Sequence, residues 1–204
     1  MKERPILFST PMIQAILAGR KTMTRRIVKG DLADCYFQSL VLHATGLFTF
    51  IKNGNYNPIQ SDVINVRCHY GQPGDRLWVK ETFAKTGAGI LYKADKNMGF
   101  TAEKWTPSIF MPRAASRILL EIVSVNVERL QDISDENAVN EGIENITPTL
   151  DDATWKNYNT NKWEHVVRHF TDPKLSFQSL WQSIHGQKSL EANPWVWVIE
   201  FKVI

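Results

Sequence analysis

The residue types best suited to chemistry lie together in one short run near the N-terminus, Gly19–Arg26. The amine of Lys21 stands three residues before the hydroxyl of Thr24. An amine beside a hydroxyl can serve as the base that turns the hydroxyl into a nucleophile. Arg25 and Arg26 follow directly. Their positive charges would lower the pKa of the amine and could hold a polar or anionic ligand, so this run is the best candidate for a reactive site.

A helix is predicted immediately before this run, over residues 11–18. Thr10 and Pro11 are typical of a helix start, because threonine accepts hydrogen bonds from free backbone N–H groups and proline fits the first turn. An apolar stripe at helical spacing follows, and Gly19 stands where a helix commonly ends. From Thr22 onward the pattern is typical of a strand. The helix therefore delivers the chain into the reactive run.

Further along the chain, alternating apolar residues predict strands over Arg76–Phe83, Ile118–Leu130 and Trp195–Val203. A second helix is predicted to begin after the N-cap residue Ser134 and to end near Glu141–Gly142. These are the elements that would have to bring any distant partner to the reactive run.

Residues 151–185 are expected to be mostly helical, with a break at Pro173. The order of elements is then strand, helix, many strands, helices and strand. That order favours an α+β fold with a mostly antiparallel sheet that closes into a small barrel, with helices at its flanks.

Glu81 is the one charged residue on the otherwise apolar face of the strand Arg76–Phe83. A charge is seldom buried without a partner. Glu81 is therefore either a carboxylate that lines a pocket or the buried partner of an arginine, and the sequence favours the pocket slightly because the inward faces of barrel strands converge.

Composition is ordinary for a globular chain that can bury a sizeable core: 204 residues, 43% hydrophobic and 22% charged. The net charge of +3 permits contact with a nucleotide or RNA without requiring it. Cys35 and Cys68 are the two cysteines and form no disulfide framework, which favours a reduced, cytoplasmic setting. No stretch has the apolar length of a signal peptide or a membrane span, so no membrane partner is expected.

Metal binding is not expected. His165 and His169 have the i, i+4 spacing that suits a metal on a helix, but no third ligand stands nearby, which favours two solvent-facing histidines. Cys35, Cys68 and His69 have poor spacing for zinc. We therefore expect no metal and no other cofactor.

The segment Ile16–Arg26 resembles the signature of the ASCH domain family, a branch of the PUA-like β-barrels. That signature is a glycine, a lysine two residues later, an acid or hydroxyl three further on, and a basic residue two after that. Gly19, Lys21, Thr24 and Arg26 fit it.

Other segments extend the resemblance over the chain in patches. Gly74–Asp75 is similar to the family's turn before a central strand, and Val198–Lys202 to its closing strand. Trp78–Thr82 and Trp105–Arg113 resemble a larger subgroup that bacteriophages and prophages encode. The resemblance implies a single domain over 1–204, with insertions relative to small members near 30–70, 84–117 and 143–192.

The resemblance also implies site residues and a substrate class. One small bacterial ASCH protein is an amidohydrolase that releases acetate from N4-acetylcytidine with a lysine, a threonine and a glutamate. Lys21 and Thr24 match the first two positions, and Glu141, in the predicted helix after the long strand, matches the third. The implied function is hydrolysis of N4-acylated cytosine nucleosides or nucleotides without metal.

Four further residues are expected to bind the substrate together with Glu81. Arg25 and Arg26 would hold polar or anionic groups. Trp105 and Arg113 could stack on and hydrogen-bond a base, although Trp105 is at least as well explained as packing over the barrel mouth.

Two roles remain open for the hydroxyl of Thr24. It could attack the acyl carbonyl while Lys21 takes its proton, with Glu141 orienting Lys21 or passing a proton to the leaving nitrogen. Alternatively, Lys21 and Glu141 could activate water that Thr24 only orients. At the level of function, the rivals are a non-catalytic module that binds RNA or modified bases, and a ribonuclease, because PUA-like barrels commonly bind RNA.

The three-residue hypothesis makes a direct prediction. Lys21→Ala, Thr24→Ala and Glu141→Ala should each abolish cleavage of N4-acetylcytidine while the circular dichroism spectrum stays that of the folded chain. Normal turnover by Thr24→Ala would exclude Thr24 as the nucleophile.

Overall fold

The computed structural model describes residues 1–30, 32–38, 47–52, 63–87, 89–95, 102, 104–147, 153–159 and 169–204. Its helices are α1 (Thr10–Leu17), α2 (Asp135–Asn140), α3 (Pro173–His185) and α4 (Gln187–Glu191). Its strands are β1 (Glu3–Leu7), β2 (Met23–Ile27), β3 (Cys35–Gln38), β4 (Leu47–Lys52), β5 (Val63–Arg67), β6 (Arg76–Lys80), β7 (Phe83–Thr86), β8 (Gly89–Tyr92), β9 (Leu119–Arg129), β10 (Trp155–Lys156), β11 (His169–Phe170) and β12 (Trp195–Val203).

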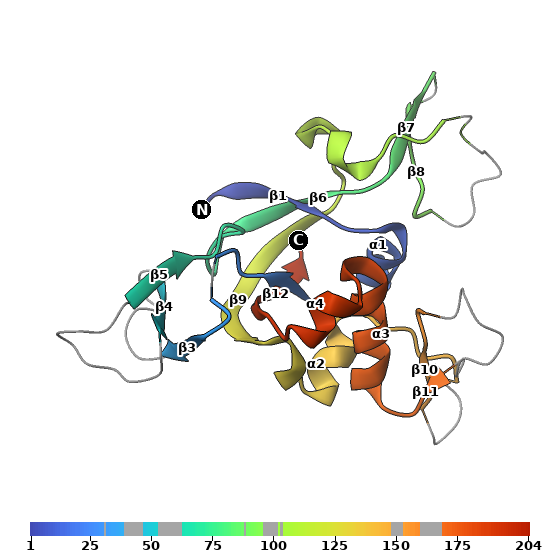
Figure 1. The fold of residues 1–204 in the computed structure, drawn as a ribbon. Coiled ribbons are helices and arrows are strands. Elements are labelled where there is room, and N and C mark those ends of the chain that lie inside the picture. Colours follow the sequence, from blue (N-terminus) through green and yellow to red (C-terminus); the bar gives the residue numbers. More distant parts are fainter. Residues whose placement is uncertain are drawn as a thin grey trace.

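A five-stranded sheet in the order β1-β6-β9-β12-β2 organises the molecule. Its neighbours pair antiparallel except β1 and β6, which are parallel. The α+β class is therefore as expected. Helix α1 joins the two edge strands, and helices α2, α3 and α4 lie together at one end of the sheet (Figure 1).

The expected closed barrel is not found. Within the described ranges, the edge strands β1 and β2 do not pair with each other. The sheet curls enough for Arg26 of β2 to donate a hydrogen bond from Nη2 to the carbonyl of Leu7 at 2.7 Å. Because β1 ends at Leu7, where the chain turns into α1, a side chain rather than a strand ladder spans the gap between the edges.

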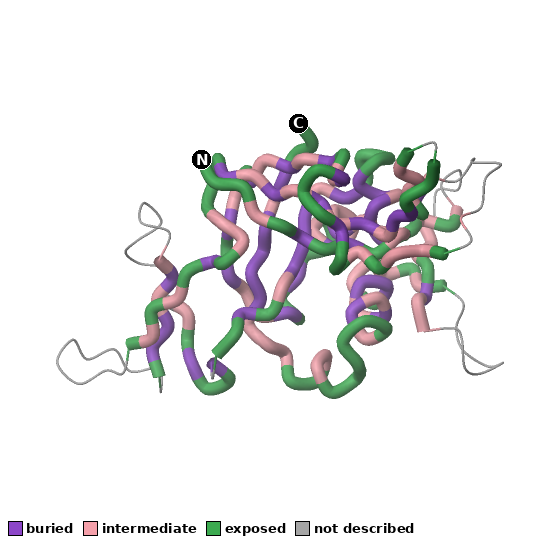
Figure 2. Tube along the Cα trace, turned by 90° about the horizontal axis from the view of Figure 1, so that it is seen from above, coloured by how far each residue is buried: buried purple, intermediate pink, exposed green. Residues whose placement is uncertain are grey.

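Strand β12 is buried on both faces, which explains its nearly continuous apolar sequence. Trp197 and Ile199 belong to the core that the sheet forms with α1 and the small sheet β3-β4-β5. Val196 and Val198 belong to a second core, formed with α2 and α3. Figure 2 shows the buried residues running along the central strands.

Several predicted elements are confirmed, and two need correction. The helix at 11–18, the helix after Ser134 and the strand at Trp195–Val203 are present. The strand predicted over Arg76–Phe83 is interrupted after Lys80, and β7 pairs with β8 in a separate hairpin that projects from the sheet (Figure 1).

The prediction of mostly helical structure over 151–185 is confirmed over Pro173–His185 and wrong at two short strands among the described residues. Trp155–Lys156 and His169–Phe170 form a short antiparallel ladder, and helix starts only at Pro173. Pro173 begins this helix rather than breaking it, because proline fits the first turn and Asp172 caps the N–H of Lys174 at 2.7 Å. Among the described residues, no helix is long and apolar enough to cross a membrane.

The small sheet β3-β4-β5 is fastened to the main sheet by aromatic rings, which gives a stability prediction. Phe50 is fully buried, and its ring lies 5.4 Å from that of Trp195, whereas Tyr36 on the same small sheet is 64% exposed. Phe50→Ala should lower the free energy of unfolding by about 3–5 kcal/mol, because it leaves a cavity. The matched variant Tyr36→Ala should change it by less than about 0.5 kcal/mol. Urea denaturation measures both, and equal effects would mean that the small sheet does not contribute to the core.

Candidate functional site

The ends of helices α1 and α2 meet, and this brings Lys21 and Glu141 together. After α1 the chain turns at Gly19, whose φ is +70°, and the N–H of Lys21 bonds back to the carbonyl of Ala15 at 3.1 Å. Glu141 is the C-cap residue of α2. The two residues form an isolated antiparallel bridge, and the N–H of Thr22 bonds to the carbonyl of Asn140 at 3.0 Å.

The side chain of Lys21 is enclosed, with an exposed fraction of 0%. Its ammonium group donates to the carbonyls of Met23 and Glu141, each at 2.8 Å, and to Glu141 Oε2 at 2.6 Å. An ammonium group has three N–H donors, so each donor has an acceptor. A buried charge of this kind is tolerated only because it is fully paired.

Glu141 is shared between two cations. Its Oε1 accepts from Arg25 Nη1 at 3.2 Å, while its Oε2 accepts from Lys21. Arg25 also donates from Nε to Glu128 Oε1 at 2.7 Å. Two cations and two carboxylates therefore form one buried network whose formal charges cancel.

Burial is the main cause that lowers the pKa of Lys21, because it penalises the charged amine. The charge of Glu141 and its hydrogen bond raise that pKa, whereas Arg26 and Arg25 lower it further. An amine whose pKa is lowered in this way is easier to convert into the neutral base that catalysis needs.

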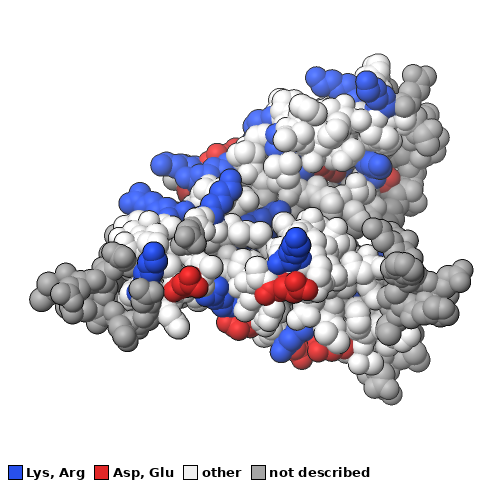
Figure 3. All heavy atoms as spheres, in the orientation of Figure 1, with Lys and Arg blue, Asp and Glu red and all other residues white. Residues whose placement is uncertain are grey.

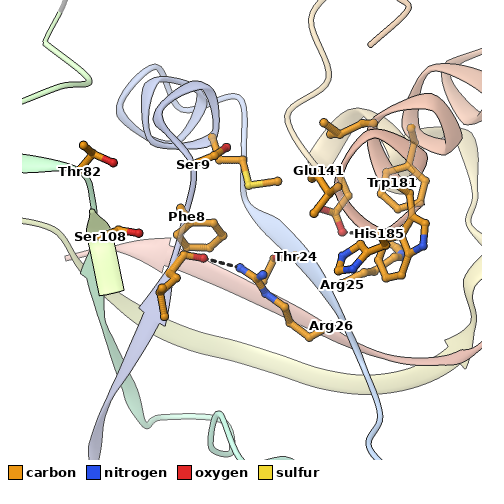
Figure 4. A pocket seen from close by; sticks show the side chains of 15 residues that line it. Phe8, Ser9, Thr24, Arg25, Arg26, Thr82, Ser108, Glu141, Trp181 and His185 are labelled. Atoms are coloured by element: carbon orange, nitrogen blue, oxygen red, sulfur yellow. Dashed lines mark hydrogen bonds and ion pairs between the residues drawn. The ribbon is translucent and has the colours of Figure 1, made fainter. Parts of the chain in front are cut away.

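A cavity of about 280 Å³ opens between the two edges of the sheet, beside this network. Thr24, Arg25, Arg26 and Glu141 line it, together with residues of β1, α1 and α3. Thr24 itself is only 2% exposed. Lys21 is absent from the lining and lies behind Glu141 and Thr24. Figure 4 shows Thr24 between Arg26 and Arg25, with Glu141 above them.

The structure separates the expected substrate-binding residues into two groups. Arg25 and Arg26 line the cavity, whereas Glu81, Trp105 and Arg113 do not. Of the two alternatives for Glu81, the structure favours the buried partner of an arginine, because Arg117 binds both of its carboxylate oxygens at 3.0 and 3.1 Å.

Trp105 is half-buried next to the bridge between Phe83 and Thr106, as expected for packing rather than base stacking. Arg113 is exposed and pairs with Glu3 at 2.9 Å. Neither side chain lines this cavity, although Ser108 of the same segment does, so contact of Trp105 and Arg113 with a ligand stays a prediction.

Four aromatic or imidazole side chains of the cavity were not predicted as site residues: Phe8, Phe177, Trp181 and His185. The rings of Trp181 and His185 lie 4.2 Å apart at the end of α3. Burial and, after it, the charge of Arg26 lower the pKa of His185. The apolar spacing of α3 was visible in the sequence, but nothing local connects that helix with a run more than a hundred residues earlier.

Metal ligands do not cluster in the described part of the chain, where no group of three or more His, Cys, Asp or Glu side chains could hold an ion. Cys35 and Cys68 are both buried. His169 lies in β11, and His165 lies outside the described residues.

Comparisons with protein-family models, with curated proteins and with solved structures return no match for this chain. The assignment of a function therefore depends on the geometry of the cavity and on the sequence signature alone.

Gly142 gives the site a steric requirement that can be tested. A Cβ at Gly142 would lie 2.7 Å from the Cβ of Lys21 and 3.0 Å from the Cβ of Ala15, and its φ is +85°. Gly74 has the same φ of +85° and no atom within 4 Å of an added Cβ. Gly74→Ala should therefore cost only the backbone strain, about 1–2 kcal/mol of unfolding free energy.

Gly142→Ala should lower the free energy of unfolding by about 1–3 kcal/mol more than Gly74→Ala does, because the added methyl group pushes both Lys21 and helix α1 away from residue 142. Thermal or urea unfolding of the two variants measures the difference. Equal costs would show that the contact between Gly142 and Lys21 is not tight in solution.

Proposed function

We propose that this chain is an ASCH-type amidohydrolase that cleaves N4-acylated cytosine nucleosides or nucleotides without a metal. The observation that carries the proposal is the buried pair of Lys21 Nζ and Glu141 Oε2, 2.6 Å apart, beside a cavity that Thr24 lines. Lys21 and Thr24 belong to the segment that resembles the ASCH signature, and Glu141 is the acid that the resemblance to the family's amidohydrolase implies. The α+β order with helices at one end of a curled sheet is compatible with a PUA-like fold.

The first chemical step is a proton transfer within the buried pair. Lys21 passes a proton to Glu141 across the 2.6 Å hydrogen bond, which leaves a neutral amine and a neutral carboxylic acid. Burial lowers the pKa of Lys21 and so reduces the cost of this transfer, whereas the charge of Glu141 opposes it. The amine can then accept the proton of Thr24 as its oxygen attacks the acyl carbon.

The second step breaks the amide. The tetrahedral oxyanion forms in the cavity beside Arg25, whose guanidinium group stabilises its charge. Glu141, now protonated, gives its proton to N4 of the cytosine, which leaves as the free amine. Water then hydrolyses the acyl-threonine, with Glu141 as the base, and Lys21 returns the proton to Thr24.

Direct attack by water is the other version of this mechanism. In that version the neutral Lys21 and Glu141 activate a water molecule, and Thr24 holds it by a hydrogen bond. Both versions consume one water molecule and give the cytosine nucleoside or nucleotide with a free 4-amino group and a carboxylate. The size of the cavity, about 280 Å³, suits one small ligand rather than a polymer in either case.

Thr24 is the residue whose substitution tests catalysis with the least effect on folding. Alanine at Lys21 or Glu141 leaves a buried charge with one partner fewer, which alone destabilises a protein by about 3–5 kcal/mol. Thr24→Val keeps the shape and suits a strand but removes the hydroxyl. It should lower kcat for N4-acetylcytidine by about a thousandfold or more, whereas Thr24→Ser should keep measurable activity.

The two versions of the mechanism differ in one measurement on the same variants. If Thr24 is the nucleophile, mass spectrometry of acid-quenched wild-type enzyme should find an acetyl group on the peptide that contains Thr24, and none in Thr24→Val. Wild-type rates in Thr24→Val would contradict both versions.

RNA binding is the second candidate function, and one surface feature favours it. Lys2, Arg4 and Arg67 line a separate hollow beside β1, although Arg4 is paired with Asp75 at 2.9 Å. Figure 3 shows basic side chains gathered around the N-terminal strand, whereas basic and acidic groups are interspersed elsewhere on this face. Affinity for RNA that falls steeply with salt, without release of acetate, would favour this candidate.

A further inference from the structure

Arg26 is the cation of the cavity whose charge is not balanced by a carboxylate. Lys21 and Arg25 are paired with Glu141 and Glu128, whereas Arg26 has no acidic side chain within ion-pair distance among the described residues. Its contacts are the hydrogen bond to the carbonyl of Leu7 and the face of the Phe8 ring, 5.2 Å from the guanidinium carbon. The positive charge therefore remains available to a ligand.

One donor of Arg26 also lacks an acceptor. Its Nε is shielded from solvent and makes no hydrogen bond in the described part of the chain. Buried donors are nearly always satisfied, and one that is not is commonly satisfied by a bound ligand or water. Arg26 lines the cavity, so an acceptor placed there can reach its guanidinium group.

Hydroxyl groups surround the same part of the cavity. Ser9, Thr82 and Ser108 line it. Figure 4 shows these residues around Phe8, on the side away from Trp181 and His185. Ser9 is the N-cap residue of α1, yet its side chain does not cap the helix. The N-terminus of α1 adds positive potential at this place.

The positive charge of Arg26 acts on the other groups of the cavity as well. It contributes to lowering the pKa of His185 and the pKa of Lys21, after burial in both cases. An anion beside Arg26 would offset this effect.

We propose that the cavity binds the phosphate of a mononucleotide between Arg26 and the hydroxyls of Ser9 and Ser108. The several terminal oxygens of a phosphate can accept from a guanidinium group and from hydroxyls at once, which suits this mixed set of donors better than a single carboxylate. The aromatic side chains Trp181 and His185 lie at the opposite end, next to Glu141, where the base and its acyl group fit. The preference for an acylated nucleotide over the nucleoside rests on the proposed amidohydrolase function, but the phosphate site does not.

Binding to the wild-type protein tests the phosphate site without any variant. Isothermal titration with cytidine 5′-monophosphate, cytidine and inorganic phosphate should give an affinity for the nucleotide about ten- to hundredfold above that for the nucleoside. Weak binding of inorganic phosphate alone should compete with the nucleotide. Equal affinities for nucleotide and nucleoside, or no binding of the nucleotide at millimolar concentration, would overturn the proposal.

Variants then locate the site. Arg26→Met should remove the preference for the nucleotide, and Arg26→Lys should keep part of it, because the charge remains while the planar donor pair is lost. Ser9→Ala removes one hydroxyl without touching the contact between Arg26 and Leu7, so it serves where Arg26→Met does not fold. Lys202→Met, which removes an exposed cation paired with Glu121 at 2.9 Å, is the control that should change nothing. A preference that survives both Arg26→Met and Ser9→Ala would place the phosphate elsewhere and overturn the assignment.

Kinetics separate this inference from the proposed function. Wild-type kcat/KM should be at least about tenfold higher for N4-acetylcytidine 5′-monophosphate than for N4-acetylcytidine. The difference should come from a lower KM, and Arg26→Met should abolish it. Hydrolysis of both compounds at equal kcat/KM would contradict the proposed phosphate site and support the amidohydrolase function. If neither compound is hydrolysed but the protein still binds the nucleotide more tightly than the nucleoside, the amidohydrolase function is contradicted and the phosphate site is supported.

Discussion

The buried ion pair between Lys21 and Glu141 is the interaction on which the candidate site depends. Removing an ammonium group and a carboxylate from water is costly, and the cost is offset only when every donor has an acceptor in good geometry. Here the three donors of Lys21 are satisfied by Glu141 and by two backbone carbonyls. That requirement fixes where α1 ends and where α2 ends. Gly142 lets them approach this closely, since any side chain there would meet Lys21.

The open edge of the sheet is the second constraint. Strand β12 is buried on both faces and holds β2 in register, so Thr24, Arg25 and Arg26 are presented from a rigid strand. Because β1 and β2 do not pair, the space between them is available to a ligand instead of being filled by a ladder. Arg26 spans this space and leaves part of its guanidinium group facing the cavity. Closure of the sheet into a barrel would have removed the cavity, so the departure from the expected barrel and the presence of a site have one cause.

Local elements were predictable where the signal was local. The turn at Gly19, the cap at Ser134 and the final strand follow from residue chemistry over a few positions, and each is found. The helical interpretation of 151–185 holds for Pro173–His185 but not for Trp155–Lys156 and His169–Phe170, which pair in a ladder that no short sequence window reveals. The family resemblance and the substrate remain predictions.

The sequence by itself determined which groups could react: the spacing of Lys21 and Thr24, the arginines after them, and the place of Glu141 at the end of a capped helix. Only the tertiary structure decided which of them share a cavity. In the folded chain Glu141 pairs with Lys21, and Glu81 pairs with Arg117 instead of lining the cavity. Trp181, from a distant helix, lines the same cavity as Glu141. The physical reason is that residue types and caps act over one or two turns of chain, whereas burial of charge depends on contacts between distant segments, 36 residues apart for Glu81 and Arg117 and 120 for Lys21 and Glu141.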